Sequence, residues 1–251
     1  MPGKGRGCQA NPTSKPMRVT VQSSAKDMEN TSTPTVRAGR HRFLGIEIEV
    51  ANGVLVPREE TELLGTTAID TLIGKDSALV IDMCCGSGNL GLAIANAIPL
   101  VKIMSADLTD ETISVARHNT QRLGFSDRVE IFQGDLFSAF DGKDIGRKAD
   151  LVVCNPPYIS AKRLEETLGH LLKDEPREAF DGGPFGISIL QRLVRDSVKF
   201  LKAGGILAFE FGEGQHQQVA QLLIRSGGYG DISFVKNELG IPRVAVARAK
   251  Y

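Results

Sequence analysis

Short apolar runs alternate with longer segments of helical periodicity through most of this chain. The apolar runs are rich in β-branched residues, which is typical of strands buried on both faces of a parallel sheet. We expect strands at 78–83, 101–106, 128–132, 150–154 and 206–211, and helices at 89–98, 110–123, 186–201 and 215–226. This alternation predicts a parallel sheet with helices on both faces.

Two last strands are expected near 231–236 and 243–248. The link between them is too short for a helical crossover, so they must be antiparallel. The fold class is therefore α/β: a doubly wound, seven-stranded, mostly parallel sheet with a terminal antiparallel strand.

The segment before the first predicted strand alternates apolar and acidic residues over 46–50. Asn52-Gly53 follows and precedes a second apolar run at 54–56. Alternation around Asn-Gly predicts a β-hairpin that turns at this dipeptide and precedes the sheet. A helix is expected next at 59–73, with acidic residues in its first turn and Gly74 as its end.

Composition separates the beginning of the chain from the rest. Residues 1–36 are dense in Pro, Gly, Ser, Thr and Asn, so they cannot bury enough apolar surface to offset their ordering entropy. Residues 1–42 carry eight basic and two acidic side chains, whereas the whole chain has a net charge of +0. A solvated, disordered basic tail is favoured, and contact with an acidic partner such as RNA is the alternative.

Several classes of protein are excluded by composition. No apolar run reaches the length of a membrane span, and no secretory signal opens the chain. The four cysteines, two of them adjacent, fit neither a disulfide framework nor a zinc template. We therefore expect a cytoplasmic enzyme without a metal, and the acidic body of the chain argues against a large footprint on duplex DNA.

The first predicted strand leads into a glycine-rich loop. Gly86, Gly88 and Gly91 satisfy G-x-G-x-x-G, and Asp107 ends the second strand nineteen positions after Gly88. In this fingerprint the glycines allow close approach of the backbone to a nucleoside-containing cofactor, and the acid binds the ribose hydroxyls. An NAD-dependent oxidoreductase shares the pattern and remains an alternative.

Acidic residues at three successive strand ends favour S-adenosylmethionine (SAM) as the cofactor. Asp82 would repel a pyrophosphate, but its carboxylate suits the amino group of the methionine part of SAM. Asp107 is expected to bind the ribose hydroxyls, and Asp135 is expected to accept from the adenine amino group. Turn capping is the alternative for Asp82 and Asp135. The methionine carboxylate is expected at the start of the helix from Asn89. The predicted cofactor-binding residues are Asp82, Cys84, Gly86, Gly88, Asn89, Asp107, Leu108, Asp135, Leu136 and Asn155.

The tetrapeptide Asn155-Pro156-Pro157-Tyr158 follows the fourth predicted strand. Two prolines end the strand and form a stiff turn where open α/β sheets bind ligands. The Asn155 side chain and the Pro156 carbonyl offer two acceptors, and Tyr158 offers an aromatic face. This set suits a planar –NH2, so we predict Asn155, Pro156 and Tyr158 as the catalytic residues of an N-methyltransferase. A Pro-Pro loop with an Asn cap is the structural alternative.

Further stretches carry a resemblance to a known family. They are 54–64 (VLVPREETELL), 175–183 (EPREAFDGG) and 201–205 (LKAGG). With the Asn-Pro-Pro-Tyr motif, the chain resembles class I SAM-dependent methyltransferases, and within them the release-factor glutamine methyltransferases (HemK-type). The resemblance implies a protein substrate methylated on a glutamine in a Gly-Gly-Gln loop. It places Pro57, Arg58, Thr61, Pro157 and Tyr158 on the substrate side; a hairpin-to-helix cap explains 57–61 equally well.

Two departures from the family pattern bear on these expectations. Cys84 stands where the family usually has Gly, which is tolerated if φ is negative there. The family's helical N-terminal domain has no counterpart before residue 42, so a small-molecule N-methyltransferase is the alternative, with a DNA amino-methyltransferase ranked lower. The expected domains are a disordered basic tail (1–37), a hairpin-and-helix lid (38–75) and the SAM-dependent methyltransferase domain (76–251).

Overall fold

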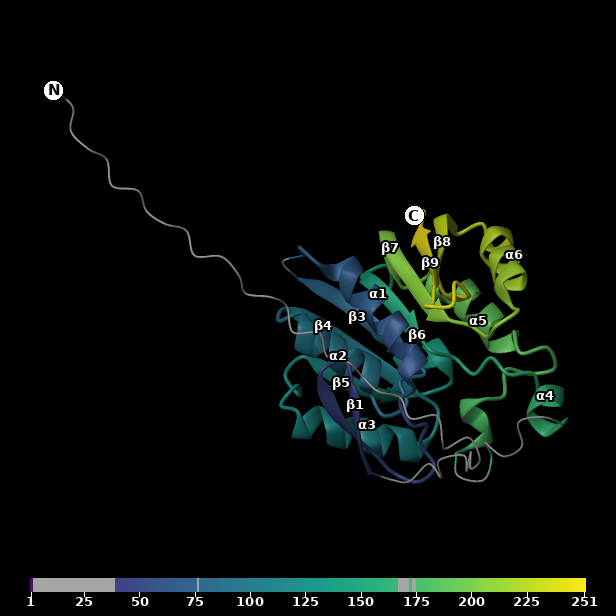
Figure 1. Cartoon of the computed structure of the whole chain (residues 1–251), viewed down its shortest axis with the longest axis horizontal. Coiled ribbons are helices and arrows are strands. Elements are labelled where there is room, and N and C mark those ends of the chain that lie inside the picture. The colour runs from purple at the N-terminus through teal and green to yellow at the C-terminus, as the bar shows by residue number, and fades with distance from the viewer. Residues whose placement is uncertain (2–38, 76, 167–171, 173–174) are drawn as a thin grey trace. The chain divides into compact units, whose positions relative to one another are not determined.

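The computed structural model describes residues 1, 39–75, 77–166, 172 and 175–251. Contacts between residues gather Thr35–Tyr251 into one compact unit, centred on a seven-stranded sheet of order β5-β4-β3-β6-β7-β9-β8 (Figure 1). The strands are β3 (Ala78–Met83), β4 (Val101–Asp107), β5 (Val129–Gln133), β6 (Ala149–Cys154), β7 (Leu201–Glu210), β8 (Tyr229–Lys236) and β9 (Pro242–Ala249). β9 is antiparallel to both of its neighbours, whereas the other paired strands are parallel. The predicted fold class is confirmed.

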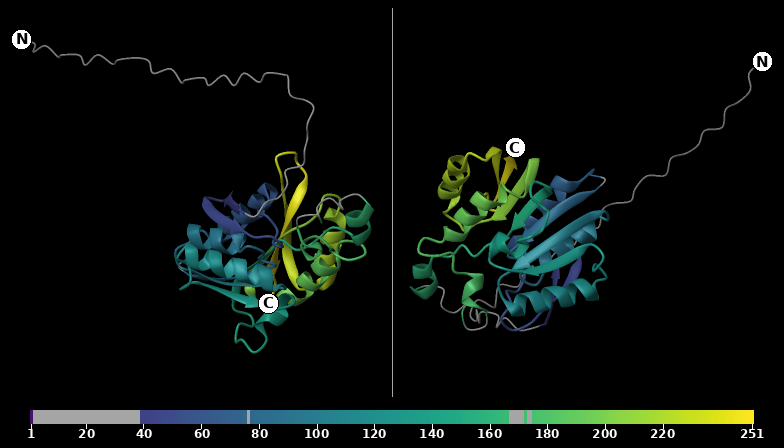
Figure 2. Two further views of the ribbon diagram at one scale, coloured as in Figure 1. Left: turned by 90° about the horizontal axis from the view of Figure 1, so that it is seen from below. Right: turned by 180° about the vertical axis from the view of Figure 1, so that it is seen from behind.

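Side chains of the central strands point alternately into two buried layers. Along β6, Leu151 and Val153 face the layer of α1 (Glu62–Leu72) and α2 (Asn89–Ala97), whereas Val152 and Cys154 face the opposite layer. That second layer is formed by the 3-10 helix η2 (Leu136–Phe140), α5 (Ser188–Ser197) and α6 (His216–Ser226). Burial on both faces explains why these strands read as continuous apolar runs. Further helices of the described residues are α3 (Asp110–Arg122), which lies beside β5 (Figure 2), and the short α4 (Ala161–Glu166), η1 (Glu59–Thr61) and η4 (Arg177–Ala179).

The β-hairpin turns at a different place from the one predicted. β1 (Gly39–Phe43) and β2 (Ile46–Val50) pair around Leu44-Gly45, where φ is 42° and 83°. A two-residue hairpin turn needs positive φ at its central residues, and only Gly45 adopts it without strain. The prediction of a turn at Asn52-Gly53 was wrong, because the run 54–56 forms no strand that could pair across it.

Two further boundaries differ from those expected. The helix predicted at 59–73 begins with the 3-10 turn η1 and continues as α1. The strand predicted from 206 begins already at Leu201, so Gly204 and Gly205 lie inside β7. A Cβ on Gly205 would lie 2.9 Å from the Ala149 carbonyl oxygen, and the register of β6 and β7 shifts at this position. Glycine at position 205 therefore allows the close approach of β6 and β7 at this bulge, and β7 continues across it from Leu201.

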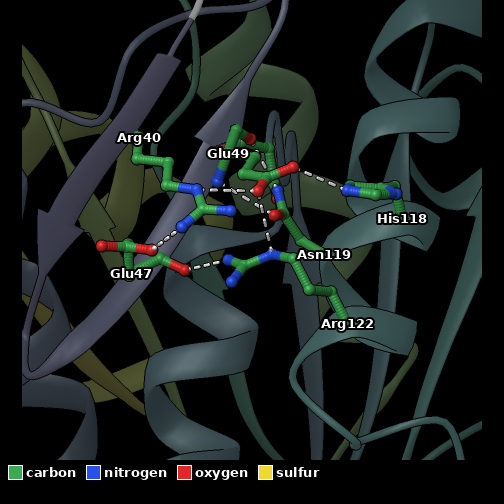
Figure 3. A network of polar contacts seen from close by, with 7 residues as sticks. Arg40, Glu47, Glu49, His118, Asn119 and Arg122 are labelled. Atoms are coloured by element: carbon green, nitrogen blue, oxygen red, sulfur yellow. Dashed lines mark hydrogen bonds and ion pairs between the residues drawn. The ribbon is translucent and has the colours of Figure 1, made fainter.

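A buried asparagine fastens the hairpin to the rest of the unit (Figure 3). Asn119 on α3 accepts a hydrogen bond from the Glu49 N–H (3.0 Å) and donates to the carbonyls of Glu49 (2.8 Å) and Ser87 (3.0 Å). The Glu49 carboxylate binds His118 at 2.7 Å and Arg40 at 3.0 Å. The hydrogen bond with His118 is the main reason that the pKa of Glu49 is lowered. Because Ser87 belongs to the glycine-rich loop, Asn119 connects the hairpin directly to that loop.

None of the helices in the described ranges has the length and hydrophobicity of a membrane span. Apart from Met1, the tail expected at 1–37 lies outside the described residues. The boundary expected between residues 75 and 76 stays a prediction.

Candidate active site

A cavity of about 300 Å³ lies at the carboxyl ends of β3, β4 and β6. β4 lies on one side of β3 and β6 on the other, so the chain changes direction across the sheet here. In open α/β sheets such a switch point forms a crevice for ligands. The loops after these strands form one side of the cavity, and residues 176–179 and Asp181 close the other.

The glycine-rich loop is tied to the end of β4. Asp107 Oδ2 accepts from the Gly86 N–H and Oδ1 from the Leu108 N–H, both at 2.7 Å. A Cβ on Gly91 would approach the Asp82 carboxylate to 2.9 Å, so the third glycine of the fingerprint is needed for α2 to pack onto the sheet. Gly88 caps α2 with φ 82° but does not line the cavity. The loop geometry thus agrees with the fingerprint.

Cys84 lines the cavity in a backbone conformation that differs from the one expected. Its φ is +57°, so the condition of a negative φ is not met. Gly86 and Gly88 also have positive φ, because the loop reverses direction tightly between β3 and α2. A non-glycine residue in the left-handed region costs about 1–3 kcal/mol, which the surrounding packing must offset.

Asp82 is fully buried and does not line the cavity. Its Oδ2 accepts from the Gly91 N–H at 3.0 Å and from the Ser105 hydroxyl at 3.4 Å. Its Oδ1 has no hydrogen-bond partner among the described residues. Burial raises the pKa of Asp82 to about 7, and the nearby Asp107 adds to this increase.

This pKa predicts a pH-dependent effect of Asp82→Asn. The folded protein retains a proton that the unfolded chain, with an ordinary pKa of 3.8, releases. The contribution of Asp82 to the free energy of unfolding therefore falls as pH rises from about 4 to about 7. Asn keeps an acceptor but cannot ionise. The free energy of unfolding of Asp82→Asn relative to that of the wild type should therefore increase by about 3 kcal/mol between about pH 5 and about pH 8. Urea denaturation without cofactor measures this, and an advantage independent of pH would contradict it.

The predicted cofactor residues Asp135, Leu136 and Leu108 also line the cavity. Asp135 lines it, and its Oδ2 pairs with Arg192 at 2.9 Å. Leu136 is buried, whereas Leu108 is half exposed, and both line the same cavity. Two apolar side chains beside a carboxylate suit a flat heterocycle that carries an amino group.

Asn155 faces both the cavity and a smaller recess beside it. Its Nδ2 donates to Thr61 Oγ1 at 3.0 Å. Its Oδ1 and the Pro156 carbonyl accept no hydrogen bond from any residue that the structure describes. Both acceptors therefore lack a hydrogen-bond partner among the described residues, but Pro156 is buried and lines neither the cavity nor the recess.

The Tyr158 hydroxyl is already engaged by two neighbouring side chains. The hydroxyl donates to Glu210 Oε1 at 2.8 Å and accepts from Arg243 Nη2 at 3.2 Å. Burial, and then the charge of Glu210, raise the pKa of Tyr158. The hydroxyl therefore stays protonated near neutral pH and cannot serve as a general base. Tyr158, a predicted catalytic and substrate-side residue, lines neither the cavity nor the recess.

Three of the five predicted substrate-side residues, Pro57, Arg58 and Thr61, line the smaller recess. The predicted cofactor residue Asn89 also lines it, and it shares Cys84, Gly86 and Asn155 with the cavity. Arg58 pairs with the buried carboxylate of Glu175, which also accepts from the Val56 N–H at 3.0 Å. Pro157 lines the larger cavity. The segment 56–58 is thereby held to residue 175, far away in the sequence.

Comparisons with known proteins now place this site in a family. The model of the "Methyltransferase small domain" family matches residues 61–185. A release factor glutamine methyltransferase of Clostridium botulinum is 33% identical over 211 residues, covering 84% of this chain and 73% of that protein. One of Rhodopirellula baltica is 36% identical over 210 residues, covering 82% and 70%. The chain belongs to the release factor glutamine methyltransferase family. The prediction of a SAM-dependent N-methyltransferase is confirmed.

A solved structure shares the fold of this methyltransferase. The ribosomal protein L11 methylase of Lactobacillus delbrueckii subsp. bulgaricus superposes with a TM-score of 0.57 at 19% identity, covering 80% of this chain and 84% of that one. At this identity the likeness supports the arrangement of the sheet and helices alone.

Family membership implies SAM as the methyl donor, and the residues of this methyltransferase fit it. The Asp107 carboxylate can accept from ribose hydroxyls at the cavity edge, and Leu108 and Leu136 can cover an adenine. The start of α2 at Asn89 offers backbone N–H groups to a carboxylate. No residue in these positions conflicts with the donor.

Sequence reasoning missed a part of the site that the tertiary structure supplies. Thr109, Thr112, Ile189 and residues 176–179 line the cavity. Thr109 and Thr112 follow Asp107 closely, so the strand-end rule could have found them. Residues 176–179 fell within a stretch of family resemblance but carried no chemical signal of their own.

Proposed function

We propose that this methyltransferase transfers the methyl group of SAM to the side-chain amide nitrogen of a glutamine in a peptide-chain release factor. The observation that carries the proposal is the free acceptor Asn155 Oδ1, on a residue that lines a cavity suited to the donor, with the carbonyl of the next residue, Pro156, also free of a hydrogen bond among the described residues. A primary amide has two N–H groups that match these acceptors. The curated relatives, which are named for release factor glutamine methylation, support this choice of acceptor.

The chain's own residues act mainly by positioning. An amide nitrogen is a weak nucleophile because its lone pair is delocalised into the carbonyl. Hydrogen bonds from both N–H groups to Asn155 and Pro156 would orient the nitrogen and favour a more pyramidal geometry. Correct positioning contributes at best about 7–11 kcal/mol. When bound, SAM supplies an electrophilic methyl on sulfur and leaves as S-adenosylhomocysteine; the nitrogen then loses its proton to water.

The remaining residue assignments are part of this proposal. Asp107 binds the ribose, Asp135 the adenine amino group and the start of α2 the methionine carboxylate. Asp82 does not line the cavity, so it supports the glycine-rich loop through the Gly91 N–H and does not contact the methionine amine. Pro57, Arg58, Pro157 and the ring of Tyr158 form the substrate side.

The partner of the enzyme is accordingly a protein with an exposed glutamine, and we expect no binding to duplex DNA or to a membrane. A cytoplasmic location, inferred from the cysteines, remains a prediction. Fractionation of the host cell with an antibody to the chain checks it.

Methyl transfer to a defined acceptor tests the function. Purified enzyme is incubated with methyl-labelled SAM and the host's release factor, and the same release factor with Gln→Ala in its Gly-Gly-Gln loop is the matched control. We expect label on the first protein only, mapped to the glutamine by mass spectrometry. Label found only in a small-molecule extract, or equally on both release factors, would show that the acceptor is different.

A further inference from the structure

A buried polar network lies beside the Asn155-Pro156-Pro157-Tyr158 loop. Glu210, the last residue of β7, is buried and lines neither the cavity nor the recess. Its Oε1 accepts from the Tyr158 hydroxyl at 2.8 Å and from Arg243 Nη2 at 3.4 Å. Thr61, equally buried, stands between this carboxylate and the Asn155 amide. The network joins residues from four separate parts of the sequence.

The Thr61 hydroxyl accepts a hydrogen bond from Asn155 and lies beside the Glu210 carboxylate. Its Oγ1 lies 3.0 Å from Asn155 Nδ2. Burial raises the pKa of Glu210, and the hydroxyl groups of Tyr158 and Thr61 beside its carboxylate oppose this increase. Glu210 Oε2 is buried and has no partner at full hydrogen-bond distance in the described ranges. Thr61 therefore faces a buried acceptor that still lacks a donor.

We propose that Glu210 and Thr61 form a positioning relay that fixes which end of the Asn155 amide faces the substrate. An asparagine amide presents an acceptor at one end and a donor at the other, with nearly the same shape. In the reversed orientation its NH2 would confront the N–H groups of the substrate amide. A hydroxyl alone does not choose between the two orientations, because it can donate or accept.

The carboxylate removes this ambiguity. An ionised Glu210 can only accept, so it takes the proton of the Thr61 hydroxyl. Thr61 Oγ1 then has only lone pairs left for Asn155, and the amide must turn Nδ2 toward it. Asn155 Oδ1 is thereby directed to the cavity. The relay rests on the proposed function, since only an N–H substrate requires this orientation.

The main chain of the loop is anchored independently of the relay. Gln215 Nε2 donates to the carbonyls of Tyr158 (2.9 Å) and Gly186 (3.0 Å), while its Oε1 accepts from the Gly212 N–H at 2.8 Å. The backbone after Asn155 is therefore held on its own, and the freedom that remains at this residue is rotation of its side-chain amide.

Substitutions at Thr61 separate the relay from simple packing. Thr61→Val keeps the shape but removes the hydroxyl, so we expect kcat to fall ~10–100-fold, with the Kd for S-adenosylhomocysteine unchanged within about twofold. Thr61→Ser restores the hydroxyl and should return kcat to within about threefold of the wild type. The matched control is Thr120→Val, because Thr120 is also buried but bonds only to a helix carbonyl. Equal losses in Thr61→Val and Thr61→Ser would overturn the relay.

A double-mutant cycle tests whether Thr61 acts through Asn155. In an Asn155→Ala background, Thr61→Val and Glu210→Gln should have no further effect on kcat, because the group that they orient is absent. If the kcat losses of the single variants multiplied in the double variants, Thr61 and Glu210 would act independently of Asn155, and the proposal would be contradicted. The cycle uses any acceptor that the wild type methylates. Lack of wild-type turnover on the release factor would therefore count against the proposed function alone.

A measurement without turnover completes the test. The side-chain NH2 signal of Asn155, identified by its loss in Asn155→Ala, reports the hydrogen bond to Thr61 in amide NMR spectra. We expect its protons to exchange with water at least about tenfold faster in Thr61→Val and in Glu210→Gln, and at an unchanged rate in Thr61→Ser. Exchange that is unaffected in Thr61→Val and Glu210→Gln would overturn the relay even if no acceptor were known.

Discussion

Asn155→Ala should lower kcat by about 10²–10³-fold and change the Kd for S-adenosylhomocysteine by less than about threefold. The free Oδ1 of Asn155 is one of two acceptors that orient the attacking nitrogen, so its loss affects the transition state far more than cofactor binding. Initial rates with saturating release factor give kcat, and calorimetry with S-adenosylhomocysteine gives the Kd. The second acceptor, the Pro156 carbonyl, belongs to the main chain and persists in the variant.

The control for this variant is Asn96→Ala, on the exposed side of α2, which removes the same group away from the site. We expect wild-type kinetics from it. If Asn155→Ala instead weakened cofactor binding as much as it slowed turnover, Asn155 would be a cofactor ligand and the orientation role would be wrong.

Asp107→Ala should weaken binding of S-adenosylhomocysteine by about 10²-fold, because hydrogen bonds to a charged group each contribute about 1.5–3 kcal/mol. The variant loses the acceptor proposed for the ribose and also releases the N–H groups of Gly86 and Leu108. Two effects thus act together, one on the ligand and one on the shape of the loop. Calorimetric titration measures the affinity.

The matched control is Asp127→Ala, an exposed aspartate in the turn before β5. It should bind S-adenosylhomocysteine as the wild type does, and both variants should retain the circular dichroism spectrum of the folded protein. An affinity of Asp107→Ala equal to that of Asp127→Ala would exclude Asp107 from the cofactor site.

Much of the fold was predictable because its signals are local. β3 was expected at 78–83 and is found there, since a short β-branched run bounded by polar residues has few other solutions. The hairpin turn was not predictable in the same way. Asn52-Gly53 carries the stronger local signal for a turn, but Leu44-Gly45 forms it. The residues after Val50 do not pair with β2, and the Val56 N–H instead donates to the Glu175 carboxylate. That contact spans more than a hundred residues and leaves no trace in a local pattern.

The sequence by itself determined the fold class, the glycine-rich loop and the acceptor pair Asn155-Pro156, because backbone preferences of glycine and proline act at the position where they stand. Only the tertiary structure brought Thr61, Glu210 and Gln215 together beside the loop that follows β6. Each is an ordinary polar residue in its own segment, and its meaning depends on which atoms from distant segments lie within hydrogen-bond reach. The orientation of a single side-chain amide is such a property. Its two ends have nearly the same shape, so only donors and acceptors brought together by packing can distinguish them.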